Sequence, residues 1–551
     1  MTEENVLNNN NAGGAGQSRA VGLFLLKRYE EAAAVYDDLL RQDPDNIVFW
    51  VNRIICILQF SSPDAAFFDD MLQRVNDLPA QGYLCLADVL CDLERYAEAL
   101  VFVNKALEAD PDNVDACLLK ARLLDISDRA DELYQFVCSF YPRLKRDERV
   151  LCFAAFYAVL FWNMEQADYF LKKALKINKY SVLQNNFFYI SLAAKNQEEK
   201  IISFGAKALD DRENNPVIWL ALGNAYAVLG QNEEANEAYE TLSGLTTISD
   251  DIRLNWANVL IEEKKFEQAF DLLNQISDFS DTLFLLMRDV LFEMLQAGHT
   301  EEAREKAVFW RSMRAENPDV NYLCTAFLGE KTDEAAPLSF VKLISEVYAV
   351  EQAERAADKK KYFGPDILDE AVQAVKLPIG RSMDVLDIGC GAGAAADVLA
   401  DFSRSSGTLT GIDISDIALD FAADKQVYGK QAYNELTETD LVSFCLANPE
   451  KYDLIAGLDS LYYFSDLTPV LTAVGTALKP GGIFIFTVRA AENGHDFDLD
   501  IYGRFKHGSG FVSECIRAAG LDEKYKAEEL LYKETETEKI DCHVFAVQKK
   551  A

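Results

Sequence analysis

The turn at residues 389–393 carries the strongest chemical signal of the chain. It reads Gly-Cys-Gly-Ala-Gly and lies between an apolar run, residues 385–388, and an alanine-rich stretch. Only glycine lets a backbone approach a ligand this closely, so the pattern is typical of an α/β sheet that binds an adenosine-containing ligand. Asp413 follows Gly393 by twenty residues and ends a second apolar run, residues 409–412. We therefore expect its carboxylate at the end of the neighbouring strand, where a ribose would need it.

The spacing of these glycines separates two kinds of adenosine site. Sites for dinucleotides follow the pattern G-x-G-x-x-G, in which the amino end of a helix stabilises a pyrophosphate. Here the glycines stand at every second position, and Asp387 comes just before them. A carboxylate at Asp387 would repel a pyrophosphate but suits a positively charged group. The pattern favours a cationic ligand, and the alternative of a glycine-rich turn without a ligand stays open.

Further motifs follow the turn in a definite order. Residues 452–455 read Tyr-Asp-Leu-Ile, Asp459 comes next, residues 478–482 read Leu-Lys-Pro-Gly-Gly, and residues 483–488 form an apolar run. Together with the glycine turn, this series resembles the class I S-adenosylmethionine-dependent methyltransferases, from about residue 382 to the C-terminus. The resemblance implies a doubly wound, Rossmann-like α/β domain with a seven-stranded sheet.

The same resemblance implies S-adenosylmethionine as the cofactor and assigns its contacts. Asp387 and the glycine turn would hold the methionine end, and Asp413 would accept hydrogen bonds from both ribose hydroxyls. Asp440 matches the acidic residue that meets the adenine amine, with Leu441 beside the ring, and Asp459 lies where cofactor or substrate is contacted. The expected cofactor-binding residues are Asp387, Gly389, Cys390, Gly391, Gly393, Asp413, Ile414, Asp440, Leu441 and Asp459.

Recognition of the methyl acceptor is expected from residues 489–510, which follow the apolar run at residues 483–488. Histidine titrates near neutrality and could take a proton from a hydroxyl or an amine before methyl transfer. Residues 502–507 resemble a Gly-Arg-Tyr-x-His segment of bacterial fusions between tetratricopeptide repeats and a methyltransferase. We therefore predict His507, rather than His495, as the base, with Tyr502 as a second catalytic residue. A purely structural histidine is the alternative.

Two other kinds of site are disfavoured by what the sequence lacks. Residues 496–500 read Asp-x-Asp-x-Asp, but Ile501 stands where a calcium loop needs glycine, and His507 stands where it needs glutamate. We expect a solvated acidic turn there and no metal site. Residues 456–459 read Ala-Gly-Leu-Asp, so the Asn-Pro-Pro-Tyr type of tetrapeptide of enzymes that methylate adenine or glutamine is absent.

The composition points to a large acidic protein. The chain has 551 residues, enough for two or three folded units, and a formal net charge of −36. Both halves are acidic, which opposes binding to nucleic acid or to an anionic membrane.

Eleven cysteines without a Cys-x-x-Cys pair predict reduced thiols in a cytoplasmic protein. The longest apolar stretch, residues 151–162, is too short to span a bilayer, so we expect no membrane insertion.

The N-terminal part of the chain contains an internal repeat. Alanines recur at intervals of 34, 33, 68, 68, 34 and 34 residues, and several are followed four positions later by a larger apolar residue. A 34-residue period is the tetratricopeptide signature, and the i/i+4 spacing places both residues on one face of a helix. The alanines are Ala32, Ala66, Ala99, Ala167, Ala235, Ala269 and Ala303. We predict about nine repeats over residues 13–317, after a disordered head at residues 1–12.

Repeat arrays of this kind present a concave surface. We therefore expect a protein or peptide partner on that surface. The alternative is an array that only supports the enzyme or forms a dimer.

A connector is expected between the repeats and the glycine turn, at residues 318–380. Residues 338–361 have the apolar stripe of a helix, residues 362–365 break it, and another helix follows. In the resembling methyltransferases, the segment before the glycine turn folds over the cofactor. By that resemblance, Tyr348 and Tyr362 are candidates for lining the site.

The sequence thus predicts an all-α tetratricopeptide solenoid, a helical connector, and a doubly wound α/β methyltransferase domain at residues 381–551. The acceptor atom would be oxygen or nitrogen, on a small molecule, a carrier-bound metabolite or a protein. The alternative is a catalytically silent scaffold, in which the repeats organise partners and the C-terminal domain keeps only a methyltransferase-like fold.

Overall fold

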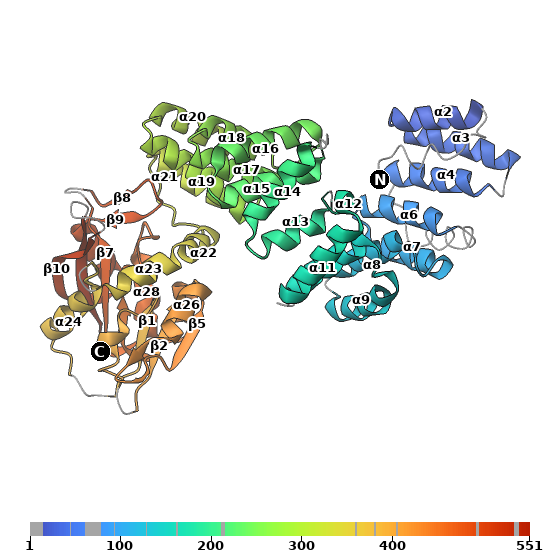
Figure 1. The fold of residues 1–551 in the computed structure, drawn as a ribbon. Coiled ribbons are helices and arrows are strands. Elements are labelled where there is room, and N and C mark those ends of the chain that lie inside the picture. The colour runs from blue at the N-terminus through green and yellow to red at the C-terminus, as the bar shows by residue number, and fades with distance from the viewer. Residues whose placement is uncertain are drawn as a thin grey trace. The chain divides into compact units, whose positions relative to one another are not determined.

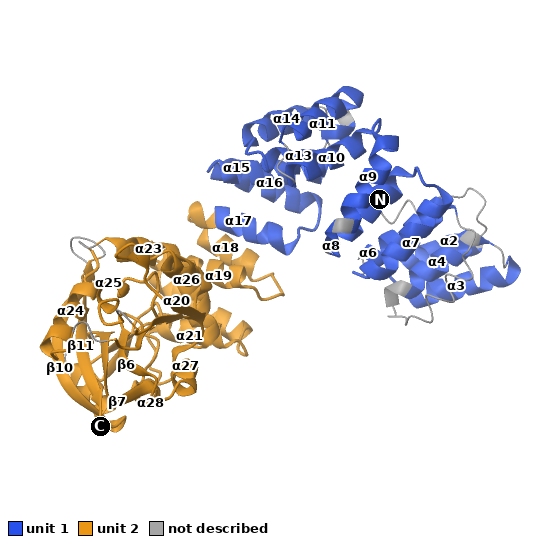
Figure 2. Cartoon of the chain, turned by 90° about the horizontal axis from the view of Figure 1, so that it is seen from below, with its two compact units in different colours: residues 1–259 blue, residues 260–551 orange. Residues whose placement is uncertain are grey.

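The chain divides into two compact units, residues 1–259 and residues 260–551 (Figure 2). The last helices of the predicted repeat array therefore belong to the same unit as the C-terminal sheet. The expected head at residues 1–12 lies outside the described residues, as does Ala66. The computed structural model describes residues 15–43, 46–60, 79–92, 94–127, 129–160, 164–183, 185–210, 215–358, 361–378, 382–403, 406–491, 495–533 and 539–550.

The described residues of the first unit form helices joined by short turns (Figure 1). The helices are α2 (Ala15–Leu25), α3 (Tyr29–Gln42), α4 (Ile47–Phe60), α6 (Ala80–Asp92), α7 (Tyr96–Ala109), α8 (Val114–Ile126), α9 (Ala130–Leu144), α10 (Glu148–Leu160), α11 (Met164–Ile177), α12 (Lys179–Leu183), α13 (Asn186–Ala193), α14 (Glu198–Asp210), α15 (Pro216–Val228), α16 (Asn232–Leu245) and α17 (Asp250–Glu262). Neighbouring helices pack against one another, because each has an apolar face that a single helix cannot bury.

The recurring alanines are buried in the helical array. Every one of them among the described residues has no exposed surface: Ala32 on α3, Ala99 on α7, Ala167 on α11, Ala235 on α16, Ala269 on α18 and Ala303 on α20. The larger apolar residues four positions later, such as Tyr36 and Tyr239, are also buried. A small side chain lets two helices approach, and the larger one fills the adjacent groove. The repeat spacing therefore correctly predicted these buried positions, while the tetratricopeptide assignment stays a prediction.

The second unit begins with helices that pack onto the C-terminal domain. They are α18 (Phe266–Leu273), α19 (Asp281–Gln296), α20 (Thr300–Met313), α21 (Pro318–Leu328), α22 (Leu338–Val347), α23 (Ala349–Ala357) and α24 (Gly364–Ala374). Phe340 of α22 has no exposed surface. Its ring centroid lies 6.1 Å from that of Phe284 on α19, 5.1 Å from Tyr322 on α21 and 6.3 Å from Tyr463. This aromatic cluster joins the last helices of the array to the domain that follows.

The connector differs from the single helix expected at residues 338–361. It forms two helices, α22 and α23, because Tyr348 between them leaves helical geometry, with φ −97° and ψ 4°. The helix ends before the next one as expected, but at other residues: α23 ends at Ala357, and Gly364 and Pro365, expected in the break, are the first residues of α24. In the part of the chain that the structure describes, no helix combines the length and apolar character needed to cross a membrane.

Seven strands form the C-terminal sheet, in the order β10-β11-β7-β6-β1-β2-β5. The central strands β5 (Glu435–Glu438), β2 (Leu409–Asp413), β1 (Val385–Ile388), β6 (Tyr452–Gly457) and β7 (Leu478–Arg489) pair in parallel. β11 (Lys539–Lys549) pairs antiparallel with β7 and with β10 (Leu521–Lys533). All residues of β1 are buried, as expected for a strand covered on both faces.

Helices cover both faces of this sheet. Those on one face are α24, α25 (Ala396–Leu399) and α26 (Asp416–Ala423), and those on the other are α27 (Leu441–Ala447), α28 (Thr468–Ala477) and α29 (Ser509–Ala518). Each face has its own core, to which β1 contributes Val385 on one side and Leu386 on the other. The predicted doubly wound, seven-stranded sheet is therefore confirmed. Two small hairpins accompany it, β3 (Gln426–Val427) with β4 (Lys430–Gln431), and β8 (Phe497–Leu499) with β9 (Phe505–His507).

The strand order reverses at β1, which has β2 on one side and β6 on the other. In open parallel sheets, ligands bind in the crevice at the carboxyl ends of the strands beside such a reversal. The fold therefore places the crevice where the glycine turn leaves β1.

Candidate functional site

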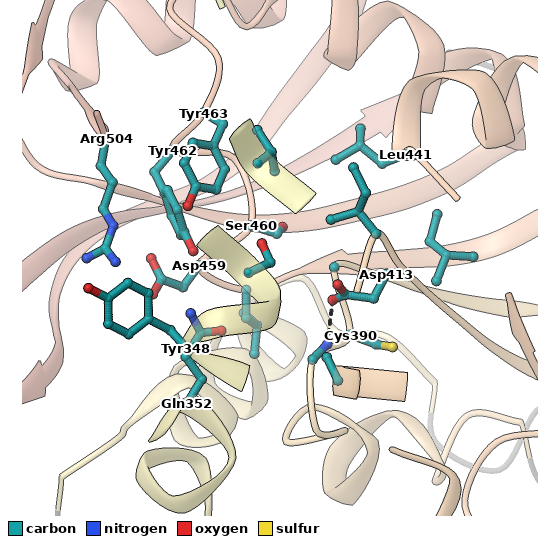
Figure 3. Close-up of a pocket in the computed structure, with 18 of the residues that line it drawn as sticks. Tyr348, Gln352, Cys390, Asp413, Leu441, Asp459, Ser460, Tyr462, Tyr463 and Arg504 are labelled. Atoms are coloured by element: carbon teal, nitrogen blue, oxygen red, sulfur yellow. Dashed lines mark hydrogen bonds between the residues drawn. The ribbon is translucent and has the colours of Figure 1, made fainter. Parts of the chain in front are cut away.

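A cavity of about 560 Å³ lies at the carboxyl ends of the parallel strands (Figure 3). It is lined by residues that follow β1, β2, β5, β6 and β7, and on another side by α22 and α23. Eight of the ten predicted cofactor-binding residues are in its wall: Gly389, Cys390, Gly391, Asp413, Ile414, Asp440, Leu441 and Asp459. Segments far apart in the sequence thus meet in one enclosed space.

The glycine turn depends on backbone geometry that other residues adopt poorly. Gly389 has φ +62°, and a Cβ there would lie 2.5 Å from the Cβ of Ser460. Gly391 has φ +52°, and a Cβ there would meet nothing within 4 Å. The first glycine is therefore required by close packing, and the second leaves room for a ligand against the backbone.

Asp413 is fixed beside this turn by two backbone donors. The Gly391 N–H donates to Asp413 Oδ2 at 2.9 Å, and the Ser415 N–H donates to Oδ1 at 3.0 Å. Burial raises the pKa of Asp413, while these two hydrogen bonds act in the opposite direction. The carboxylate is oriented at the cavity wall, where it can accept hydrogen bonds from a pair of hydroxyls.

Asp387 and Gly393 lie behind the cavity wall rather than in it. Asp387 is 1% exposed, and its Oδ2 accepts a hydrogen bond of 2.7 Å from the Tyr433 hydroxyl. Burial raises the pKa of Asp387 to about 7, since the charged form loses its hydration. Asp387 can therefore act on a ligand through its charge, from behind the glycine turn.

Asp440 and Leu441 stand at the start of α27, beside the loop that carries Ile414. Asp440 is the N-cap of this helix, and its Oδ1 accepts a hydrogen bond of 2.9 Å from the Ser443 N–H. The cap fixes the carboxylate at the cavity wall. These residues offer an acidic acceptor and an apolar surface, as an adenine ring would need.

Asp459 lies between the two ends of the cavity and pairs with Arg489. The Nε and Nη2 atoms of Arg489 donate to the two carboxylate oxygens of Asp459 at 3.1 Å and 3.2 Å. Asp459 itself has φ +47°, a left-handed conformation that is strained for a residue with a Cβ. Burial works to lower the pKa of Arg489, but the Asp459 carboxylate outweighs it, and the net shift is upward. Arg489 therefore stays charged.

Tyrosines and arginines line the end of the cavity away from the glycine turn. Figure 3 shows Arg504, Tyr462 and Tyr348 on one side, with Cys390, Asp413 and Leu441 on the other. Tyr348, Tyr362, Tyr462, Tyr463, Tyr502, Tyr532, Arg489 and Arg504 all contribute to the wall. Tyr348 and Tyr362, predicted from the resemblance, are thus in place.

Several of these residues were not predicted as site residues from the sequence. Tyr462 and Tyr463 follow Asp459 in the loop after β6, and Arg489 ends the largely apolar run of β7. A charged residue at the end of a buried strand was the available signal for Arg489. Tyr532 comes from β10, the edge strand of the sheet. Its place at the site depends on the antiparallel pairing of β10 with β11 and of β11 with β7, which the sequence motifs did not indicate.

The structure does not place His507 where an acceptor's base would have to be. His507 has no exposed surface, is not among the cavity-lining residues, and lies with Nε2 2.8 Å from the Phe464 carbonyl oxygen. Burial lowers its pKa to about 4, because the protonated ring loses hydration. The geometry therefore favours the structural alternative. Tyr502, the second predicted catalytic residue, does line the cavity.

The acidic turn before Tyr502 stabilises its own loop. The backbone N–H groups of Tyr502 and Arg504 both donate to Asp500 Oδ1, each at 2.9 Å. His495 Nδ1 lies 2.7 Å from an Asp498 carboxylate oxygen, on an exposed surface. Among the described residues, no group of three or more histidines, cysteines or acidic residues could hold a metal ion.

The cavity residues fit a cationic adenosine ligand. The open face of Gly391 and the oriented carboxylates of Asp413 and Asp440 lie in the cavity wall, and the buried Asp387 lies behind the glycine turn. These groups could hold a methionine-like end, a ribose and an adenine in that order. Beyond Asp459, the cavity continues among tyrosine and arginine side chains.

Comparison with known families agrees with this geometry. Residues 352–517 match the family model of a methyltransferase domain. The matched region begins in α23 and ends in α29, so it contains the five parallel strands at whose carboxyl ends the cavity lies and leaves out β10 and β11.

Individual relatives match only the C-terminal part of the chain. A ubiquinone biosynthesis O-methyltransferase of Thiobacillus denitrificans is 31% identical over 121 residues, which are 22% of this chain and 49% of that protein. Its counterpart in Pseudomonas savastanoi pv. phaseolicola is 30% identical over 140 residues, which are 24% of this chain and 58% of that protein. The chain thus spans about half the length of the curated relatives it matches.

A solved structure is similar over the same part. Magnesium protoporphyrin IX methyltransferase from Synechocystis PCC 6803, solved with bound SAH, is 14% identical with a TM-score of 0.30, over 39% of this chain and 99% of that chain. Family match, sheet topology and cavity residues together identify the C-terminal part as a class I methyltransferase domain with S-adenosylmethionine as its cofactor.

Proposed function

We propose that the protein transfers a methyl group from S-adenosylmethionine to an oxygen or nitrogen atom of an acceptor. The observation that carries this proposal is the continuous cavity, which runs from the glycine turn to the tyrosines and arginines beyond Asp459. Cofactor and acceptor would share one enclosed space, and placing two reactants in line is the main requirement of methyl transfer.

The chain's own residues would position the reactants. Gly389 to Ala392 and Asp387 would hold the methionine end, Asp413 the ribose, and Asp440 with Leu441 the adenine. When bound, S-adenosylmethionine supplies a methyl group whose bond to sulfur breaks with the electron pair left on sulfur, while the acceptor's lone pair forms the new bond and its proton leaves to water or a base. Tyr462, Tyr463 and Tyr532 would exclude water around the acceptor.

Asp459 is better suited to positioning than to proton transfer. Its two carboxylate oxygens are occupied by Arg489, and its backbone N–H donates to Thr487 Oγ1 at 2.8 Å. It would hold Arg489 against the ring of Tyr462, where the guanidinium carbon lies 4.3 Å from the ring centroid. Tyr502 would contact the acceptor near the mouth of the cavity, since its side chain is half exposed.

Calorimetric titration with S-adenosylmethionine and S-adenosylhomocysteine tests the proposal. We expect micromolar binding to the intact protein and about 10- to 100-fold weaker binding to Asp413→Ala, because charge-assisted hydrogen bonds to the ribose are lost. Asp420→Ala, an exposed change on α26, is the matched control and should bind like the wild type. No binding to the wild type would overturn the proposal and favour the scaffold alternative.

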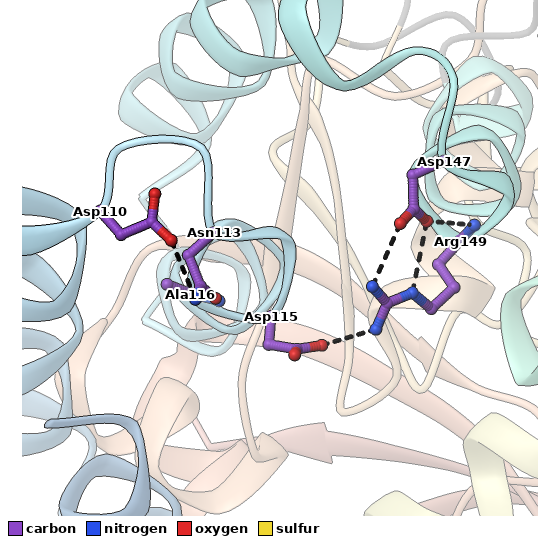
Figure 4. A network of polar contacts seen from close by, with 6 residues as sticks. All are labelled: Asp110, Asn113, Asp115, Ala116, Asp147 and Arg149. Atoms are coloured by element: carbon purple, nitrogen blue, oxygen red, sulfur yellow. Dashed lines mark hydrogen bonds and ion pairs between the residues drawn. The ribbon is translucent and has the colours of Figure 1, made fainter. Parts of the chain in front are cut away.

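The helical array would bind a protein or peptide on its concave surface, as tetratricopeptide repeats do. The regular turns between its helices support this assignment. Asn113 caps α8 by accepting a hydrogen bond of 3.0 Å from the Ala116 N–H (Figure 4). Arg149 joins successive helix pairs, since it donates to Asp115 at 2.6 Å and to Asp147 at 3.1 Å. Links of this kind between successive helices are what a solenoid of stacked helix pairs would need.

The acceptor could be carried by that partner or be a free metabolite. Incubation of captured partners with labelled S-adenosylmethionine distinguishes the two. Label on a partner protein with the wild type, and none with Asp413→Ala, would identify a protein acceptor. Label only in the small-molecule fraction would identify a metabolite and leave the array as a scaffold.

A further inference from the structure

The acceptor end of the cavity contains more positive than negative charge. Arg489 and Arg504 both line it, and Asp459 is the acidic residue that faces Arg489 there. Arg355 and Glu351 also belong to the cavity wall and form an ion pair of 2.8 Å with each other. Because Arg489 and Asp459 pair through two hydrogen bonds, their charges offset each other. The charge of Arg504 remains, although the whole chain carries a net charge of −36.

Arg504 has no carboxylate partner among the residues that the structure describes. No acidic side chain there lies within 4 Å of its guanidinium nitrogens, and its Nε atom is buried without a hydrogen-bond partner. Its contacts are tyrosines: the guanidinium carbon lies 5.7 Å from the ring centroid of Tyr462, and the Tyr463 hydroxyl interacts with it. The tyrosine rings attract the guanidinium and offset part of the cost of its desolvation, but neutral phenols do not neutralise its charge.

A second donor without a partner lines the same end. The Tyr532 hydroxyl is buried and has no hydrogen-bond partner among the described residues. Tyr532 and Arg504 both belong to the cavity wall. Buried polar groups are nearly always hydrogen-bonded, so two buried donors that face one cavity indicate a ligand with oxygen atoms that can accept hydrogen bonds from both.

The loop that carries Arg504 is held rigidly. The Arg504 N–H donates to Asp500 Oδ1 at 2.9 Å, and the Tyr322 hydroxyl donates to the Gly503 carbonyl oxygen at 2.9 Å. Gly503 has φ +79°, and a Cβ there would lie 2.9 Å from the Tyr322 ring, so only glycine fits. The guanidinium is therefore already in place before a ligand arrives, which favours tight and specific recognition.

We propose that the methyl acceptor is a carboxylate, whose anionic group pairs with Arg504 while its reacting part lies among Tyr348, Tyr462 and Tyr463. This inference rests on the proposed function and names the acceptor class of the same site. Arginine presents a planar fork of donors that matches the two oxygens of a carboxylate. The tyrosine rings give an apolar surface for the carbon skeleton between that group and the reacting atom.

The carboxylate of the cofactor itself is the competing partner for Arg504. Figure 3 shows Arg504 beyond Tyr462 and Asp459, on the side away from Cys390 and Asp413. Arg504 also comes from the hairpin after β7, whereas the glycine turn follows β1. The position therefore favours the acceptor, and the experiment separates the two.

The test uses intact protein saturated with S-adenosylhomocysteine and three pairs of probes: formate and formamide, acetate and acetamide, benzoate and benzamide. We expect at least one carboxylate to bind about tenfold or more tightly than its amide, by calorimetry, and Arg504→Gln to remove that preference. Arg504→Lys should keep part of it, because the charge remains without the fork. Lys506→Gln removes a charge from the same hairpin, outside the cavity wall, and should change nothing.

Three outcomes would overturn the inference. One is the absence of any preference for carboxylates in the wild type, and another is a preference that survives in Arg504→Gln. The third is a loss of S-adenosylhomocysteine affinity in Arg504→Gln as large as the loss for the carboxylate, which would assign Arg504 to the cofactor. If the wild type fails to bind S-adenosylhomocysteine, the proposed function fails. The same probe pairs, titrated in the absence of S-adenosylhomocysteine, still decide whether Arg504 binds a carboxylate.

Discussion

The ring of Tyr502 stacks on the ring of Phe292, with centroids 5.0 Å apart and planes 16° apart. Phe292 lies on α19, one of the helices that continue the array, whereas Tyr502 lies in the loop that carries Arg504. The acceptor end of the cavity is therefore built partly on helices outside the methyltransferase domain.

Replacing Phe292 by leucine should loosen the loop while keeping apolar bulk. Stacked aromatic pairs contribute about 0.5–1.5 kcal/mol beyond burial, so affinity for a carboxylate probe should fall about 2- to 10-fold. Affinity for S-adenosylhomocysteine should not change, since its site lies at the other end of the cavity. Calorimetry of both ligands checks this, with Phe309→Leu on α20 as the control. Equal effects of the two variants would refute the role of the stack.

Gly389→Ala should damage the cofactor site through backbone strain and a clash. The new Cβ would lie 2.5 Å from the Cβ of Ser460, at a φ of +62°. We expect a loss of about 1–3 kcal/mol in stability and at least tenfold weaker cofactor binding. Gly429→Ala is the matched control, because its φ is +74° but a Cβ there would meet nothing within 4 Å. Thermal unfolding and calorimetry should show a small stability change and intact binding for Gly429→Ala.

Cofactor affinity should depend on pH through Asp387. Its pKa is raised by burial to about 7, and the ionised form attracts a cationic ligand. Affinity for S-adenosylmethionine should therefore rise about 5- to 10-fold between about pH 6 and about pH 7.5. In Asp387→Asn, binding should be weak and nearly independent of pH in this range. A flat profile in the wild type would show that Asp387 does not act on the ligand.

His507 should make the C-terminal domain less stable in mild acid. Its pKa in the folded protein is lowered to about 4 from 6.5, so below 6.5 the unfolded chain binds a proton that the folded chain does not. This group alone should cost about 2 kcal/mol of stability at about pH 5 relative to neutral pH. Hydrogen exchange of β7 amides measures the loss.

The control for this prediction is His507→Gln, which keeps a donor for the Phe464 carbonyl but does not titrate. Its stability should fall less between neutral pH and about pH 5. The comparison must be made between the two proteins, because the pKa of His543 is also lowered by burial and acts in the same direction. Identical pH dependence in both would remove His507 as the cause.

The cofactor half of the site could be predicted from the sequence because its residues belong to short contiguous motifs. The glycine turn, Asp413 and Asp440 each follow one strand, and parallel strands bring their carboxyl ends together. The spacing of the alanines likewise predicted which positions are buried between helices. In these cases, the spacing of residues within one short segment was enough to predict their place in the fold.

The acceptor half could not be predicted in the same way. Tyr462, Arg489 and Tyr532 come from three separate segments, and only the pairing of β11 with both β7 and β10 brings the last of them to the cavity. His507 was selected by its chemical type, and the sequence could not show that its side chain is buried with Nε2 close to two backbone carbonyl oxygens. Helix periodicity also could not show that Tyr348 would divide the connector into two helices.

The aromatic cluster around Phe340 has a practical consequence for dissecting the molecule. Phe340 is fully buried, and its neighbours Phe284 and Tyr322 lie before the matched methyltransferase region begins. A fragment cut at the start of that region would leave Tyr463 without this cover and expose a large apolar surface to water. A recombinant fragment that contains the C-terminal sheet should therefore begin before α19, with the last helices of the array retained as part of the folding unit.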